Sequence, residues 1–196
     1  MLRLNPMNER NDRALTGKTI AILATEGFEQ VELDSPKATL SRRGATIHVI
    51  APEEGTIRGW DEDDWGDEVE VDVRLADADA DIYDALVLPG GLFNPDSLRR
   101  NEDALDFVRA MHDRKVPIAA ICHAPWILID AGLVKGKTMT SYPTVRTDLE
   151  NAGAEWRDEE AVCDGQLITS RSPEDLEAFN DALTEALTEG RVRKAS

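Results

Sequence analysis

The chain alternates short apolar runs with longer amphipathic segments. Four runs are typical of buried strands, and they lie at residues 18–25, 46–52, 84–91 and 116–121. Helical spacing of apolar residues predicts helices at residues 29–45, 101–115, 144–153 and 172–187. Strands and helices that alternate in this way predict an α/β fold, in which helices cover both faces of a mostly parallel sheet.

Weaker patterns add smaller elements to this plan. Short strands are predicted at residues 55–60 and 68–73, the second from its period-two alternation. Between them, the "DEDDWGDE" segment at 61–68 is expected to be a solvated acidic loop, because it lacks the ligand spacing of a calcium loop. Residues 160–171 predict a hairpin that turns at Asp164-Gly165.

Composition narrows the class of protein. The 196 residues are 41% apolar, which is enough for one domain with a substantial core. We expect this domain at 18–188, between a flexible leader at 1–17 and a flexible tail at 189–196. Lysine and arginine total 22 and aspartate and glutamate 39, so the net charge is −17, which argues against direct nucleic-acid binding.

The two cysteines indicate where the protein works. Cys122 and Cys163 form no CxxC pair, so neither a zinc ribbon nor a thioredoxin motif is present, and no metal site is expected. A disulfide framework is not expected either, which favours a reducing cytoplasm. No apolar run approaches the roughly 20 residues of a membrane span, and the first 18 residues lack the apolar core of a signal peptide. We therefore expect a cytoplasmic protein without membrane association.

Cys122 stands where an apolar strand run meets a helical pattern. Such a junction presents a nucleophile on a sharp turn, and the partial positive charge of a helix N-terminus lowers a thiol pKa. The ends of two other strand runs, at 25–29 and 89–91, should meet it, because ligand sites form at the carboxyl ends of parallel strands. The alternative is that Cys122 only packs as a small apolar residue.

Its neighbours supply further candidate chemistry. His123 could act as acid or base, and its backbone N–H could bind an oxyanion. Gly90 and Gly91 let the backbone approach a ligand closely, so the Gly91 N–H could be a second oxyanion donor. Alternatively, the glycines only form a turn and His123 is a packing or surface residue.

Three carboxylates lie near the same strand ends. Glu29 and Glu32 follow Phe28, and an apolar setting would raise the pKa of either carboxyl and let it donate a hydrogen bond to a thiolate. Glu32 is equally explained as a first-turn acid that favours the helix dipole. Asp96 is either a site residue or only a helix cap.

Several motifs together resemble one known family. They are "GFEQVEL" (27–33), "ALVLPGG" (85–91), "NPDSLR" (94–99), "AAICHAPWILIDAGLVKGKTMTSYP" (119–143), "NAGAEW" (151–156) and "ITSR" (168–171). In this order and spacing they resemble the PfpI family of intracellular-protease-like and protein-deglycase proteins, in the class I glutamine-amidotransferase-like superfamily. The match extends over about residues 18–187 and implies a flavodoxin-like three-layer sandwich with a nucleophile elbow.

The resemblance also implies roles for individual residues. Cys122 would be the nucleophile with His123 as its partner, and Glu29 would be the protonated carboxyl that contacts the sulfur. Backbone N–H groups of Gly91 and His123 would bind the oxyanion. Asp96 matches the position of an acid that, in some members, reaches the histidine of a neighbouring subunit; the protease-like members have Glu there, and the loop before Asp96 is one residue longer than theirs. The resemblance further implies a homodimer or larger homo-oligomer and no cofactor.

Three functions are compatible with these residues. The first is a stress-response enzyme of the glyoxalase III or deglycase type, acting on reactive aldehydes or on early glycation adducts of proteins and peptides. The second is an intracellular cysteine peptidase or other hydrolase. The third is a redox-sensing or chaperone-like stress protein that uses oxidation of Cys122. Glutamine hydrolysis is disfavoured, because no histidine follows His123 and the downstream His-x-Glu of glutaminases is missing.

Overall fold

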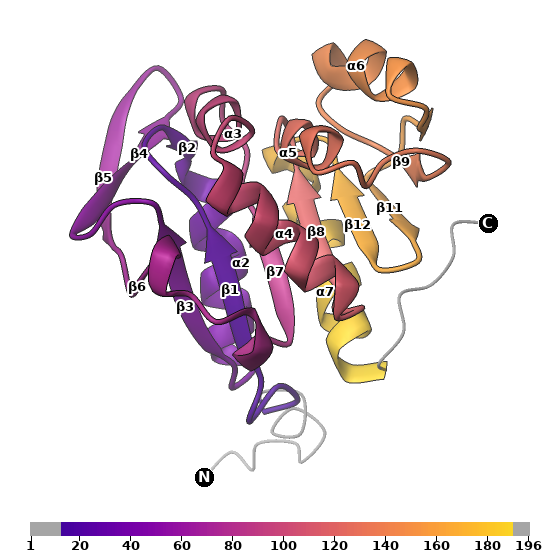
Figure 1. Cartoon of the computed structure of the whole chain (residues 1–196). Helices are drawn as coiled ribbons and strands as arrows, with labels where there is room; N and C mark the ends of the chain where they lie inside the picture. The colour runs from indigo at the N-terminus through magenta and orange to yellow at the C-terminus, as the bar shows by residue number, and fades with distance from the viewer. Residues whose placement is uncertain (1–12, 190–196) are drawn as a thin grey trace, which may run out of the picture.

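A seven-stranded sheet runs through the middle of the computed structural model, which describes residues 13–189 (Figure 1). Neighbouring strands pair in the order β11-β12-β8-β7-β1-β3-β6, and every pair is parallel except β11–β12. The strands are β1 (Thr19–Leu23), β3 (Thr46–Ala51), β6 (Val73–Arg74), β7 (Ala85–Leu88), β8 (Ile118–Ile121), β11 (Ala161–Asp164) and β12 (Leu167–Ser170). This arrangement confirms the predicted α/β class with a mostly parallel sheet.

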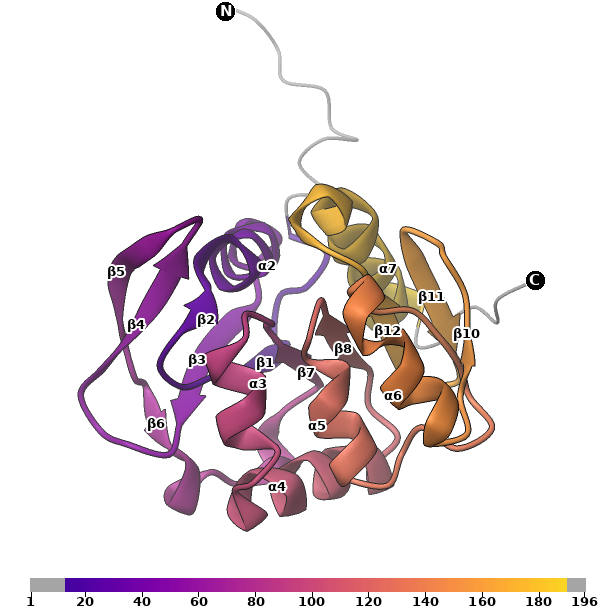
Figure 2. The same cartoon turned by 90° about the horizontal axis from the view of Figure 1, so that it is seen from above.

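Helices cover both faces of the sheet (Figure 2). One face carries α2 (Gln30–Arg42) and α7 (Leu176–Glu189), and the other carries α3 (Phe93–Leu98), α4 (Glu102–Asp113) and α5 (Pro125–Asp130). In β1, Ile20 and Ile22 pack on the α2 side, whereas Ala21 and Leu23 pack on the α4 side. Because both faces of the strands are buried, the strands are continuous apolar runs.

Short elements complete the chain between these layers. A two-stranded sheet and four 3-10 turns join the larger elements: β9 (Thr138–Met139), β10 (Glu155–Trp156), Leu75–Asp77, Ala80–Ile82, Pro143–Val145 and Pro173–Asp175. The helix predicted at 144–153 is the shorter α6 (Arg146–Asn151). The predicted hairpin turn at Asp164-Gly165 is present, and Gly165 adopts the positive φ of 65° that such turns require. None of the described helices is long and apolar enough to cross a bilayer.

A second sheet of three strands lies at one edge of the sandwich, where β2 (Phe28–Glu29) pairs with β4 (Thr56–Asp61) and β4 with β5 (Asp64–Glu70). The expectation that residues 61–68 form an acidic loop was wrong, because β5 begins at Asp64 and the loop is only two residues long. Trp60 and Trp65 are paired across the hairpin with their rings 5.5 Å apart. Such aromatic cross-strand pairs stabilise a hairpin even when acidic residues flank them.

The domain begins earlier than the sequence indicated. Residues 13–17 form a turn in which Leu15 is fully buried with Leu40, and the Leu15 N–H donates a 2.8 Å hydrogen bond to the Arg43 carbonyl. The expectation of a flexible leader over 1–17 was therefore wrong for residues 13–17, since an apolar side chain ties them to the core. The rest of that leader and residues 190–196 of the expected tail lie outside the described residues.

Candidate active site

The carboxyl ends of β1, β7 and β8 lie side by side at one end of the main sheet. In the sheet β1 lies between β3, the next strand of this sheet along the chain, and β7, which follows β6, so the strand order reverses here and this end of the sheet is a topological switch point, where ligand sites form in open α/β sheets. The Glu29 N–H donates to the Gly90 carbonyl at 3.3 Å and so joins the loops after β1 and β7. A cleft of about 390 Å³ opens there, with Cys122 and His123 in its wall.

Cys122 forms a sharp turn between β8 and α5. Its φ of +62° lies in the left-handed region that side chains other than glycine rarely adopt. Backbone hydrogen bonds hold this conformation on both sides: the Cys122 N–H donates to the Ser170 carbonyl at 3.0 Å, and its carbonyl accepts from the Tyr142 N–H at 2.9 Å. Strain that the surroundings impose in this way is typical of functional turns and of nucleophile elbows.

His123 has both ring nitrogens engaged. Nδ1 lies 3.1 Å from the sulfur of Cys122, and Nε2 lies 3.2 Å from the hydroxyl oxygen of Thr144. The ring stacks on Tyr142 at a centroid distance of 4.8 Å and is 5.1 Å from the ring of Trp126. Burial lowers the pKa of His123 and so keeps the imidazole neutral near pH 7. A neutral ring can donate to a thiolate through Nδ1 while Nε2 accepts from Thr144.

The carboxyl beside the sulfur belongs to Glu32. Its side chain is fully buried beside Cys122, and its Oε2 accepts from the Gly90 N–H at 2.8 Å. The assignment of this contact to Glu29 was therefore wrong. Glu29 has extended backbone before the first residue of α2, and its side chain is only half-buried, at the mouth of the cleft. Glu32 lies on the helix face that also buries Leu33, Pro36 and Leu40.

The fold raises the pKa values of both Glu32 and Cys122. Burial raises the pKa of Glu32 to about 8, opposed by the hydrogen bond from Gly90. Burial also raises the pKa of the Cys122 thiol, as does the charge of an ionised Glu32, whereas the N–H groups of Gly91 and His123 lower it. The pKa lowering expected from the helix N-terminus is therefore outweighed. At neutral pH Glu32 keeps its proton, so a thiolate beside it meets a hydrogen-bond donor instead of a negative charge.

The two glycines after β7 let three backbone segments come together. Gly91 has a φ of +82°, and a Cβ atom there would lie 2.5 Å from the Gly27 carbonyl oxygen. A Cβ atom on Gly90 would lie 2.7 Å from the Cβ of Cys122. Both distances are shorter than real side chains allow, so only glycine can bring the Gly91 N–H to the sulfur.

The short helix α3 carries one residue that the sequence did not single out. Asn94 is fully buried; its Oδ1 accepts from the Thr25 N–H at 2.8 Å, and its Nδ2 donates to the carbonyls of Pro89 and Gly90 at 2.8 and 3.1 Å. Asn94 thus ties together the turns after β1 and β7. Asp96 is exposed on the same helix, and in the described part of the chain no hydrogen bond joins it to His123.

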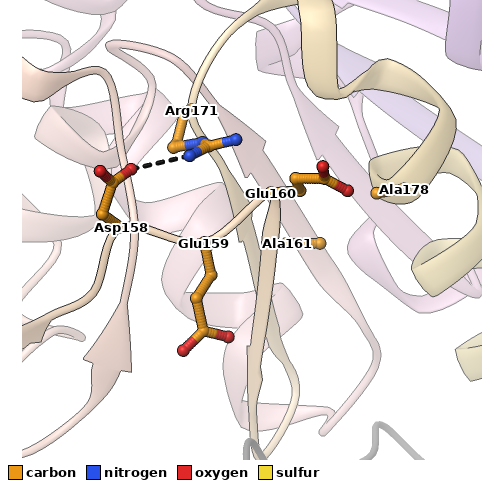
Figure 3. A pocket seen from close by; sticks show the side chains of 6 residues that line it. All are labelled: Asp158, Glu159, Glu160, Ala161, Arg171 and Ala178. Atoms are coloured by element: carbon orange, nitrogen blue, oxygen red, sulfur yellow. Dashed lines mark hydrogen bonds and ion pairs between the residues drawn. The ribbon is translucent and has the colours of Figure 1, made fainter.

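A second hollow, of about 510 Å³, lies beside β11 and α7 (Figure 3). It is acidic, but Arg171 donates to Asp158 at 2.7 Å and forms a two-point ion pair with Asp175. No cysteine or histidine lines this hollow, so it offers no nucleophile. Across residues 13–189, no group of three or more His, Cys, Asp or Glu side chains could hold a metal ion.

The sequence and the fold are both similar to those of known proteins. The model described as "DJ-1/PfpI family" matches residues 18–186. YraA of Bacillus subtilis, provisionally named a cysteine protease, is 43% identical over 164 residues, 83% of this chain and 94% of YraA. The deglycase TK1284 of Thermococcus kodakarensis is 42% identical over 160 residues, 82% of this chain and 93% of the relative. The crystal structure of Drosophila melanogaster DJ-1beta superposes with a TM-score of 0.81 at 30% identity, covering 88% of this chain and 91% of that one.

Proposed function

Because the chain belongs to the DJ-1/PfpI family, we propose that it is a cysteine-dependent stress-response enzyme, acting on reactive aldehydes such as methylglyoxal or on their early adducts with amines and thiols. One observation carries this proposal: Cys122 stands on a strained turn with an imidazole nitrogen 3.1 Å from its sulfur and the buried carboxyl of Glu32 beside it. A nucleophile, a hydrogen-bond donor to it and a group that gives and takes a proton are what cofactor-free aldehyde chemistry uses.

The first step is addition of the sulfur to the aldehyde. The Cys122 thiol first releases its proton to solvent; the thiolate then attacks the aldehyde carbon, a C–S bond forms, and the carbonyl π electrons move onto oxygen. The backbone N–H groups of Gly91 and His123 point to the sulfur and can hold that oxyanion. Glu32 then gives its proton to the oxygen, which completes a hemithioacetal.

The second step moves a proton between neighbouring carbons. The Glu32 carboxylate formed in the first step removes the proton from the former aldehyde carbon, the C–H electrons form a carbon–carbon double bond, and the ketone π electrons move onto oxygen, which takes that proton from Glu32. Return of the proton to the second carbon gives a thioester. Water attacks the thioester carbon and releases lactate and the thiolate, so methylglyoxal and water together give lactic acid. An adduct on an amine or thiol would in addition release the amine or thiol.

The test is lactate release from methylglyoxal by the purified protein and by Cys122→Ser. Cys163→Ser is the matched control, because Cys163 is the other free cysteine and does not line the cleft. We expect turnover in the wild type and in Cys163→Ser and none above background in Cys122→Ser with an unchanged circular dichroism spectrum. No turnover of methylglyoxal or its adducts by folded protein with reduced Cys122 would exclude the proposal.

A peptidase function, suggested by the name of YraA, has less support in the geometry. Peptide hydrolysis needs His123 to protonate a leaving amine, and an acid would orient the ring. Here Nε2 of His123 lies against the hydroxyl of Thr144, and Asp96 is exposed. In this alternative, Asp96 acts only when a second copy of the chain brings it to His123.

A further inference from the structure

Two carboxylates stand at the mouth of the cleft and take no part in the chemistry above. Glu29 ends β2, and Glu62 occupies the turn between β4 and β5, so pairing of β2 with β4 holds both on the same side of the opening. We refer to Glu29 and Glu62 as the acidic lip.

The negative charge of the acidic lip is not neutralised. No lysine or arginine lines the cleft, and neither carboxylate forms an ion pair within the described part of the chain. Burial and the nearby charges of Asp61 and Glu62 raise the pKa of Glu29, which means that the fold disfavours its charge. The second acidic hollow differs, since Arg171 stands in its wall and pairs with Asp158 (Figure 3).

Aromatic rings stand beside the acidic lip. Trp60, Phe93 and Tyr142 line the cleft, and the rings of Trp60 and Phe93 are 5.9 Å apart at an interplanar angle of 69°. The indole N–H of Trp60 donates to the Glu62 carbonyl at 2.9 Å, so the ring and the turn are fixed to each other. Carboxylates combined with aromatic faces recognise ammonium and guanidinium groups.

An unpaired atom inside the cleft indicates that a ligand completes it. Oε1 of the fully buried Glu32 has no nitrogen or oxygen donor among residues 13–189, although Glu32 lines the same cleft as the acidic lip. Buried polar atoms are rarely left in this state. A bound substrate hydroxyl or amine nitrogen would supply the missing partner.

We propose that the acidic lip is a subsite for a cationic side chain, so that the preferred substrates are adducts on peptides or proteins with a lysine or arginine at or next to the modified residue. This inference rests on the proposed function, whose reacting carbon it positions at Cys122. The carboxylates of Glu29 and Glu62 bind the ammonium or guanidinium group, and the rings of Trp60 and Phe93 cover its apolar stem.

The first test measures the charge preference of the cleft without any turnover. In a Cys163→Ala background, Cys122 is labelled with methanethiosulfonates that carry either a trimethylammonium or a sulfonate group. The sulfur attacks the reagent's sulfenyl sulfur, forming a mixed disulfide and releasing methanesulfinate. Each rate is divided by the rate of 2-mercaptoethanol with the same reagent. We expect the cationic reagent to be favoured about tenfold or more, and Glu29→Gln and Glu62→Gln each to lower this preference about three- to tenfold.

Glu70→Gln is the matched control, because Glu70 is exposed at the other end of β5 and does not line the cleft. Glu70 is the last of the seven residues of β5, which places it about 20 Å from the turn, more than twice the Debye length at physiological salt. We expect this variant to keep the wild-type preference. The inference is wrong if the normalised rates of the two reagents are equal, or if all three variants lower the preference equally.

The second test uses turnover. Lactate release is compared for methylglyoxal adducts of the dipeptides acetyl-Lys-Cys, acetyl-Gln-Cys and acetyl-Glu-Cys. We expect kcat/KM to fall in that order and the Lys-to-Gln ratio to approach one in Glu62→Gln. If no adduct is turned over while the labelling preference is present, the proposed function fails and the cationic subsite stands. If all three adducts are turned over equally and there is no labelling preference, the proposed function stands and the cationic subsite fails.

Discussion

The carboxyl of Glu32 on α2 lies against the thiol of Cys122 at the end of β8, and the two groups share a water-excluded position. Burial raises the pKa of both groups, and an ionised Glu32 raises the pKa of the Cys122 thiol further. When the thiol gives up its proton while Glu32 keeps its own, the sulfur is a nucleophile beside an acid. The pair, and not the cysteine alone, is therefore the reactive unit of the site.

Replacing Glu32 with Gln should remove most of the activity and leave the fold intact. A glutamine has the same size and can still accept from the Gly90 N–H, but it cannot transfer a proton. We expect kcat for lactate release to fall about 100-fold or more, as general-acid losses usually do. Glu29→Gln is the comparison, and its loss of kcat should be at least about tenfold smaller. Equal losses in the two variants would contradict the assignment of the proton donor to Glu32.

The same carboxyl should make the protein less stable as pH rises. The pKa of Glu32 is 4.5 in an unfolded chain and about 8 in the fold, so between these values only the folded state keeps the proton. The stabilisation is full below pH 4.5 and is lost as pH rises towards 8. Each pH unit in this window lowers the free energy of unfolding by about 1.4 kcal/mol.

Urea denaturation at several pH values checks this slope. Glu32→Gln cannot titrate at this position, so the stability difference between wild type and variant isolates the carboxyl from His123 and other groups. Between about pH 6 and pH 8 the free energy of unfolding of the wild type should fall by about 2 kcal/mol relative to that of Glu32→Gln. If the free energies of unfolding of wild type and variant depend on pH in the same way, the fold does not raise the pKa of Glu32.

The fold and the position of the nucleophile could be predicted because they depend on local patterns. Strands buried on both faces are unbroken apolar runs, so β1, β3, β7 and β8 are visible in the sequence. Cys122 is visible for a related reason, since it interrupts one of these runs immediately before a helical pattern. Neither inference needs knowledge of contacts between distant residues.

The identity of the buried glutamate depends on where the helix starts. The α2 helix begins at Gln30, so Glu29 lies outside it in extended backbone, whereas Glu32 lies in its first turn. A helix start placed one residue too early puts both glutamates on one helix face, because residues i and i+3 share a face. Such boundary errors are normal for sequence patterns, and the periodic burial of Glu32, Leu33, Pro36 and Leu40 is the pattern that resolves this one.

Long-range contacts explain the other differences. The β4–β5 hairpin depends on Trp60 and Trp65 meeting each other and Phe93, which lies far along the chain. The role of Asn94 depends on backbone groups of two separate turns. No local pattern distinguishes such an asparagine from a solvated one.

Removing the side chain of Asn94 should destabilise the protein more than an ordinary asparagine substitution. Asn94→Ala leaves the Thr25 N–H and the Pro89 carbonyl buried without their partner, which should cost about 2–4 kcal/mol. Asn101→Ala is the control, because Asn101 makes one capping hydrogen bond to the Ala104 N–H and should cost about 1 kcal/mol. Midpoints of urea unfolding measure both. A smaller loss for Asn94→Ala would show that water replaces the side chain.

The hydroxyl of Thr144 should set which nitrogen of His123 carries the proton. When Nδ1 donates to the sulfur, Nε2 must accept, and Thr144 is the donor 3.2 Å away. Thr144→Val keeps the shape but removes that donor, so the tautomer protonated on Nε2 becomes more populated. We expect kcat to fall about three- to tenfold, because the wrong tautomer cannot donate to the thiolate.

Two measurements separate this effect from a general structural one. Thr144 is exposed, so the valine should change the free energy of unfolding by no more than about 0.5 kcal/mol. Nitrogen-15 chemical shifts of the His123 ring report the tautomer directly and should move towards the form protonated on Nε2. Thr144→Ser restores a hydroxyl and should recover both the shifts and most of the activity. If the valine variant loses activity with unchanged ring shifts, Thr144 acts by contacting the substrate and does not act through the histidine.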